Sequence, residues 1–84
     1  MMTLRVRYFA SLREAFGAEE TVEMPVGATL GELRDALIAR GGAYAERLAR
    51  DRALRCALDQ AMADEASPIH ADAEVAFFPP VTGG

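Results

Sequence analysis

The feature that most constrains the fold is an alternation of apolar and charged side chains over residues 3–9. Leu4, Val6 and Tyr8 fall on one side of an extended chain and two arginines fall on the other, which is the period of a strand with one buried face. Phe9 falls on the arginine side, where a large ring needs a cover or a partner. Because the chain has only 84 residues, this strand and every other element are expected to share one domain with one core.

A second alternation over residues 20–24 predicts a strand that pairs with the first one. Thr29, followed three residues later by Glu32, forms a capping box that predicts the start of the main helix. The apolar positions of that helix recur at helical spacing until Gly41-Gly42, and they are Leu30, Leu33, Leu37 and Ile38. A lone helix of this length is marginal in water, so its apolar stripe must lie on the sheet.

The remaining elements are shorter. Ser11 with Glu14 is a second capping-box pattern, which predicts one or two helical turns ending at Gly17. The other expected elements are a short helix over 43–51 and strands over 54–58, 61–63 and 74–78. Pro79 and Pro80 end the last strand because neither residue can donate to a sheet ladder.

The order of strand, strand, main helix, strand, short strand, strand predicts an α+β fold of the β-grasp type. In that fold a mixed sheet of about five strands has one main helix packed across it. The expected organisation is a β-grasp domain over residues 1–78 and an extended C-terminal tail over residues 79–84 that ends in Gly-Gly. Six residues from Pro79 can span about 20 Å, enough to reach a buried active site in another protein.

Charge and composition exclude several classes of function. A formal net charge of −4 and a pI near 4.8 argue against binding to nucleic acid or to an anionic membrane surface. Arg, Asp or Glu interrupts every apolar run before it reaches a bilayer-spanning length. The single cysteine cannot form an internal disulfide, and the N-terminus does not resemble a signal peptide, so we expect a cytoplasmic protein.

The sequence also lacks the clustered side chains that catalysis or a metal site requires. His70 lies in a polar loop and is expected to be an ordinary surface histidine. Cys56 alternates with Leu54 and Leu58 and is expected in the core. There is no glycine-rich phosphate loop, so any nucleotide must be bound by a partner, and we expect no cofactor and no metal on this chain.

The remaining candidate for a functional site is the C-terminal tail, and no side chain after Glu74 is charged. Pro79 and Pro80 fix φ and direct the chain away from the sheet, while the two terminal glycines lack a Cβ and fit a narrow channel. The Gly84 carboxylate is then the reactant. A carboxylate is a poor electrophile, so an ATP-dependent enzyme must first convert it to an acyl-adenylate, after which sulfur can replace AMP to give a thiocarboxylate.

All nine cationic side chains are arginines and none is a lysine. An activated C-terminus would therefore meet no ε-amine on its own chain, although the N-terminal amine remains. The alternative explanation is a bias of base composition towards arginine.

The same residues carry a family resemblance. Residues 75–84, Val-Ala-Phe-Phe-Pro-Pro-Val-Thr-Gly-Gly, resemble the C-terminal signature of the molybdopterin synthase small subunit, a ubiquitin-like sulfur carrier. Residues 8–14 resemble the N-terminal block of that family. The resemblance implies a heterotetramer with two large subunits, which hold the active site and take up the tail as it donates sulfur to the pterin precursor of the molybdenum cofactor. It also implies activation by an adenylating enzyme similar to the ubiquitin-activating class, which uses ATP.

The resemblance assigns roles to matching positions only. Gly84 would become the acyl-adenylate and the thiocarboxylate, with Gly83 beside it. The expected partner contacts are Phe78, Pro79, Pro80, Val81, Thr82, Phe9 and Arg13. Strand parity independently places Ala76 and Phe78 on the outward face with Phe9, where they form an apolar patch unless loops cover both rings. Two departures from the family pattern, at residues 56–60 and 72–74, concern turns and leave the tail unaffected.

Three alternatives remain. A ubiquitin-like sulfur carrier for thiamine synthesis or tRNA thiolation shares the fold and the terminal Gly-Gly. A protein modifier attached once to a target lysine also fits the tail, although without lysine it cannot build ordinary isopeptide chains on itself. A plain β-grasp binding module would keep its function after deletion of Gly84, whereas a carrier would lose it.

Overall fold

The structure, a computed structural model, describes residues 1–79. Its elements in chain order are β1 (Met2–Tyr8), α1 (Ser11–Phe16), β2 (Glu19–Met24), α2 (Leu30–Ile38), α3 (Gly42–Arg47), β3 (Arg55–Leu58), β4 (Ala61–Ala63) and β5 (Glu74–Phe78). The predicted order of strands and main helix is confirmed, and the last strand has the bounds that the sequence predicted.

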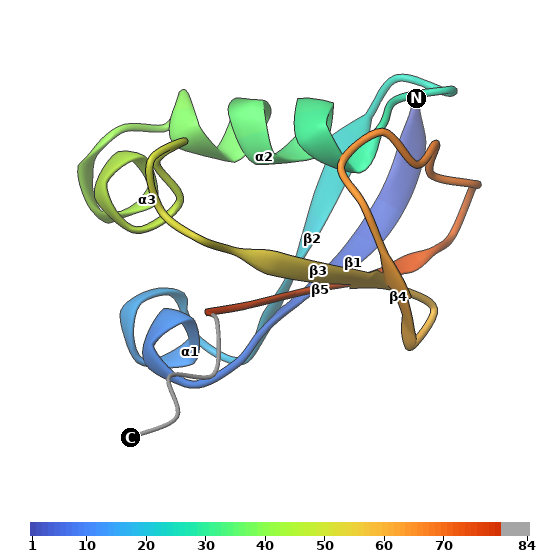
Figure 1. The fold of residues 1–84 in the computed structure, drawn as a ribbon. Coiled ribbons are helices and arrows are strands. Elements are labelled where there is room, and N and C mark those ends of the chain that lie inside the picture. Colours follow the sequence, from blue (N-terminus) through green and yellow to red (C-terminus); the bar gives the residue numbers. More distant parts are fainter. Residues whose placement is uncertain (80–84) are drawn as a thin grey trace.

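The strands form a mixed five-stranded sheet in the order β2-β1-β5-β3-β4. β1 is antiparallel to β2 and parallel to β5, and β3 is antiparallel to both β5 and β4. α2 crosses one face of this sheet, while α1 and α3 lie at the end where β5 finishes (Figure 1). This is the ubiquitin-like β-grasp, with β5 as its central strand.

The core lies between α2 and the sheet. Leu30, Leu33 and Leu37 of α2 are fully buried against strand residues of matching parity, among them Val6 and Val75. Fully burying a side chain of this size contributes about 1.5–3 kcal/mol, so the apolar stripe of α2 and the strand alternation stabilise each other. Cys56 belongs to this core, as predicted.

The two predicted capping boxes have different outcomes. At α2 the box is formed, because the Glu32 N–H donates to Thr29 Oγ1 at 3.2 Å and the Thr29 N–H donates to Glu32 Oε1 at 2.9 Å. At α1 the prediction is wrong, since Ser11 is the first helical residue and the N-cap is Ala10, whose side chain cannot accept a hydrogen bond. Ala10 has φ 54° and ψ −130°, a conformation that favours glycine.

The two departures from the family pattern fall at turns. Asp59 and Gln60 join β3 to β4 with φ of 49° and 69°, and a two-residue loop with both values positive is a type I′ turn. Asp72 has φ 61° just before β5. Asp tolerates this region better than most side chains, which suits Asp59 and Asp72, whereas Gln60 adopts it without that advantage.

Candidate functional site

The root of the tail is the end of β5. Phe78 is its last strand residue, and Pro79 is half-buried beside α1 and the loop that precedes β3. Pro80, Val81, Thr82, Gly83 and Gly84 lie outside the described residues, so the roles predicted for them remain predictions.

Phe9 and Phe78 meet on the face of the sheet that α2 leaves open. Their rings pack edge to face, with centroids 6.2 Å apart and planes at 85°. Phe9 is 36% exposed, so loops do not cover it, and the Arg7 guanidinium lies 5.1 Å from the centroid of its ring. The alternative of two covered rings is therefore wrong for Phe9, while Phe78 is half-buried beside it.

The same face continues across the sheet through small residues. Ala76 is aligned with Arg7 on one side and with Ala57 on the other, and Ala57 is aligned with Met62 of β4. Ala76 thus lies on the predicted face, although its neighbours leave it only 9% exposed. Two alanines at the centre make this part of the sheet shallow enough for another protein to approach its backbone.

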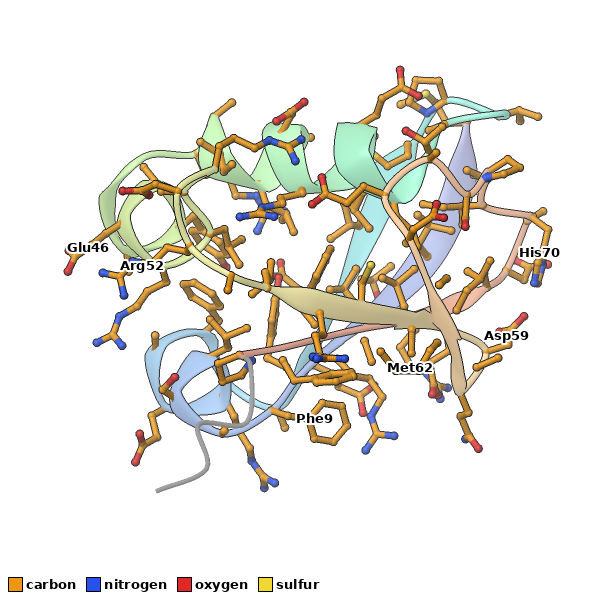
Figure 2. The ribbon with its side chains drawn as sticks, in the orientation of Figure 1. Phe9, Glu46, Arg52, Asp59, Met62 and His70 are labelled. Atoms are coloured by element: carbon orange, nitrogen blue, oxygen red, sulfur yellow. The ribbon has the colours of Figure 1, made fainter. Side chains whose placement is uncertain are left out.

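Met62 is a member of this face that the sequence did not predict. Its side chain is 60% exposed, and Figure 2 shows it on the same side of the sheet as Phe9, away from α2. The open apolar patch therefore consists of Phe9, Ala57, Met62, Ala76 and Phe78. A bulky apolar residue between Ala61 and Ala63 was the available signal, but its face depends on the register between β3 and β4.

Charged side chains border the open apolar patch. Arg5 lies within ion-pair distance of Glu19 at 3.5 Å and of Glu74 at 3.6 Å, and Arg7 lies 3.8 Å from Glu74. These are long, solvent-exposed pairs, which contribute little to stability. They form a polar rim of the kind that surrounds the apolar centre of a protein interface.

Arg13 lies on α1, next in space to Phe9. Its backbone N–H donates to the carbonyl oxygen of Phe9 at 3.4 Å, and its side chain is exposed. The abrupt turn at Ala10 brings α1 back over the end of β1, so Phe9 and Arg13 are presented together. The structure thus brings together the predicted contacts Phe9, Arg13, Phe78 and Pro79 at one end of the sheet.

A surface pocket of about 290 Å³ adjoins the root of the tail. Its apolar wall comes from Leu12, Leu54 and Pro79, and its charged wall from Arg47, Asp51 and Arg52. It lies where α1 faces the loop that connects α3 to β3.

Arg34 fixes the loop that forms one wall of this pocket. The residue is 3% exposed, and its guanidinium donates to the carbonyl oxygens of Leu48 at 2.8 Å and Arg52 at 3.1 Å, and to Glu65 at 2.7 Å. A buried guanidinium is tolerable only when its donors are satisfied in this way. An arginine within the apolar stripe of a helix was a usable signal for this role, but its carbonyl partners are set by tertiary structure.

The two side chains with nucleophilic character stand apart from the root of the tail. Cys56 is 5% exposed, and burial raises the pKa of its thiol. His70 is exposed, as predicted, and pairs with Asp59 at the end of the sheet where β5 begins (Figure 2). Within residues 1–79, no three His, Cys, Asp or Glu side chains are arranged as metal ligands.

None of the helices in the described part of the chain is long and apolar enough to cross a bilayer.

Comparison with known proteins gives three similar chains and one family match. The molybdopterin synthase sulfur carrier subunit of Escherichia coli is 36% identical over 81 residues, which cover 96% of this chain and 99% of that protein. The crystal structure of small archaeal modifier protein 1 from Haloferax volcanii superposes with a TM-score of 0.83 at 26% identity, covering 96% and 100% of the two chains.

The third result is a subunit in the complex of subunits 1 and 2 of the molybdopterin-converting factor from Helicobacter pylori. It superposes with a TM-score of 0.68 at 23% identity over 99% of this chain and all of that one, and at this identity it supports the fold alone. The sequence model of the ThiS family matches residues 6–84, from the first strand to the last glycine. Since that match covers nearly the whole chain, this protein belongs to the ThiS family.

Proposed function

We propose that this protein is the sulfur carrier subunit of a molybdopterin synthase. The observation that carries the proposal is the near full-length similarity to the Escherichia coli carrier subunit, together with a Gly-Gly terminus that follows an open apolar patch. The chain is a substrate and donor rather than a catalyst, and the active site is expected on the large subunit.

In the proposed reaction the Gly84 carboxylate attacks the α-phosphorus of ATP on an adenylating enzyme similar to the ubiquitin-activating class. Pyrophosphate leaves and an acyl-adenylate forms. A sulfur nucleophile then attacks the acyl carbon and AMP leaves, which gives a thiocarboxylate. Its sulfur is finally transferred to the pterin precursor to build the dithiolene of molybdopterin.

The open apolar patch is the proposed contact with the large subunit. Phe9, Met62 and Phe78 supply apolar and aromatic area of the type that dominates binding energy at protein interfaces. Because the patch adjoins the root of the tail, docking there would direct residues 79–84 into the partner's active site. The expected assembly is a heterotetramer with two large subunits.

Intact mass after loading tests the chemistry. The full chain is incubated with its adenylating enzyme, ATP and a sulfur source, and a mass gain equal to the exchange of one oxygen for one sulfur is expected. Fragmentation should place the change at Gly84. An unchanged mass, in an assay whose enzyme is active on its own reference substrate, would reject the proposal.

A variant that lacks Gly84 is the matched control. It retains Phe9, Met62 and Phe78, so it should bind the large subunit at close to the wild-type affinity and yet accept no sulfur. Supplying the loaded wild-type chain to the large subunit and measuring dithiolene formation separates molybdopterin synthesis from thiamine or tRNA thiolation.

A protein modifier is the second candidate, and the likeness to the Haloferax modifier protein is the observation that favours it. This function predicts an isopeptide bond between Gly84 and a target lysine. Trypsin cleaves this chain last after Arg55, so mass spectrometry of tryptic peptides from the host would show target lysines that carry residues 56–84 of this chain.

A further inference from the structure

Four of the nine arginines form neither an ion pair nor a side-chain hydrogen bond within residues 1–79, and all four are exposed. They are Arg13, Arg47, Arg52 and Arg55. The other five are held by carboxylates. In the described part of the chain, the side chains of these four arginines therefore make no polar contact that stabilises the fold.

These four arginines, the arginine collar, surround the root of the tail. Arg47 and Arg52 line the same pocket as Pro79. Arg55 is the register partner of Phe78, and Arg13 follows a pocket-lining leucine on α1. Residues 80–84 can span at most about 17 Å from Pro79, and Arg47 and Arg52, which share its pocket, fall within that length.

The difference between arginine and lysine matters at this place. A guanidinium stays protonated and has no free amine to attack a carbonyl carbon, whereas the ε-amine of lysine, with an ordinary pKa near 10.4, is neutral for a small fraction of the time. Tethering compensates for that small fraction, because effective molarities of well-oriented intramolecular reactions reach about 10⁵ M or more. A lysine in the collar would compete for an activated Gly84.

The thiol, the imidazole and the terminal amine of this sequence are either buried or far from Pro79, and Ser11, which lines the pocket with Pro79, offers a hydroxyl rather than an amine. Cys56 is in the core. His70 is hydrogen-bonded to Asp59, which also accepts from the N–H of Glu74, so it lies beyond the start of β5. From Pro79 back to Glu74 is about 17 Å at the rise of a strand, which already equals the full reach of residues 80–84, and the amino group of Met1 lies beyond Glu74 at that end of the sheet. Figure 2 shows Arg52 at one end of the molecule and His70 at the other.

We propose that the arginine collar is an amine-free zone that preserves the activated C-terminus for a nucleophile brought by the partner. It provides positive charge where a partner must dock and offers no amine to acylate. The inference rests on the proposed function, since only an activated carboxyl needs this protection. It makes arginine, rather than any cation, the required residue at positions 47 and 52.

The reaction that the collar prevents is lactam formation. In an Arg52→Lys chain the neutral ε-amine would attack the Gly84 carbonyl carbon, a C–N bond would form, and the bond from that carbon to the leaving group would break. The leaving group departs with its electron pair, and the amine proton goes to water. The product is a ring closed through an isopeptide bond, and it can no longer take up sulfur.

A C-terminal thioester tests this without any partner enzyme. The full chain is released from an intein fusion by a small thiol, which leaves an activated acyl group on Gly84. Arg47→Lys and Arg52→Lys are compared with the wild type and with Val26→Lys. Val26 is 79% exposed, and it follows Met24, the register partner of Met2, so its new amine lies at the opposite end of the sheet from Pro79.

We expect Arg47→Lys and Arg52→Lys to lose the thiol and form the lactam at least about tenfold faster than Val26→Lys, as intramolecular proximity predicts. The wild type should only hydrolyse slowly. Peptide mapping should locate the crosslink between position 47 or 52 and Gly84. Because both substitutions are exposed and break no contact, unchanged thermal unfolding confirms that the fold is intact.

The inference is overturned if both collar variants hydrolyse at the wild-type rate without a lactam, or if the wild-type thioester acylates itself. The thioester reaction does not use the adenylating enzyme. A failure here is thus separate from a failure of the intact-mass assay, which tests the proposed function itself.

Discussion

The ring of Phe9 meets the ring of Phe78 edge to face because β1 and β5 run parallel and end side by side. One ring comes from the start of the chain and the other from the last strand before the tail. The pair forms an apolar surface at the place from which the tail departs. A partner that binds this surface is positioned to receive the C-terminus.

Replacing Phe78 by alanine should weaken binding to the large subunit. A half-buried aromatic ring at the centre of an interface contributes about 2 kcal/mol or more, so the affinity should fall by more than about tenfold. Titration calorimetry measures the affinity. Val26→Ala is the matched control, since Val26 is exposed and apolar but lies at the other end of the sheet, and equal losses in both variants would remove the patch from the interface.

Met62→Glu should lower the same affinity with little effect on folding. The side chain is 60% exposed in the free protein, so a carboxylate there stays hydrated until a partner arrives. Burying that charge against an apolar partner is costly. We expect the association to become undetectable by gel filtration while the urea unfolding midpoint changes little; retained association would show that β4 is outside the interface.

Arg34→Ala should destabilise the fold by about 2–3 kcal/mol, as expected when buried acceptors lose their hydrogen-bond donor. The carbonyl oxygens of Leu48 and Arg52 and the carboxylate of Glu65 would lose their donor. Arg50→Ala is the comparison, because the Arg50 side chain is 47% exposed and its ion pairs should contribute only about 0–1 kcal/mol. Urea unfolding gives both values, and similar losses would contradict the assigned role of Arg34.

Ala10→Gly should stabilise the protein by up to about 1 kcal/mol. The strain of φ 54° and ψ −130° on a residue with a Cβ is of order 1–3 kcal/mol, and the added freedom of glycine in the unfolded chain offsets part of the gain. Ala39→Gly is the opposite case: Ala39 has φ −64°, so the change should cost about 0.5–1 kcal/mol. Thermal unfolding distinguishes the two signs.

Glu20 should make the free energy of unfolding depend on pH in the acid range. Burial alone raises its pKa, but hydrogen bonds from Arg40, Tyr8 and Tyr44 outweigh this and hold the pKa of Glu20 below its ordinary 4.5. A carboxylate with a lowered folded pKa stabilises the protein above the unfolded value and loses that contribution as pH falls through the folded one. The free energy of unfolding of the wild type, measured with urea, should therefore fall at pH values below the ordinary pKa of glutamate.

The Glu20→Gln variant isolates this effect. It should be less stable than the wild type at neutral pH by about 1–2 kcal/mol, the scale of hydrogen bonds to a charged acceptor. The difference should shrink as the wild-type carboxylate becomes protonated in acid. A constant difference across the whole range would show that Glu20 is not the titrating group.

The parts of the fold that local patterns decide were predictable. The alternation of Leu4, Val6 and Tyr8 and the capping box at Thr29 depend on neighbours within a few residues, and both are confirmed. At Ser11 the same kind of pattern gave a wrong N-cap, since a Ser-x-x-Glu sequence does not specify which residue is the first helical one.

The features that the sequence did not predict depend on contacts distant along the chain. Met62 joins the open apolar patch only through the register of β4 with β3. The burial of Arg34 depends on carbonyl groups fourteen and eighteen residues away. Glu20 looks like an ordinary surface residue of a strand until α3 brings Tyr44 beside it. None of these partners is specified by local spacing.

The central place of β5 has a mechanical consequence. The strand is bonded along both edges, to β1 on one side and to β3 on the other, and β1 runs in the same direction. A pulling force applied to the chain beyond Pro79 would act on the hydrogen bonds along both edges of β5 at once, instead of breaking them one at a time. An enzyme that binds and pulls the end of this chain would therefore move the whole folded domain rather than unfold it.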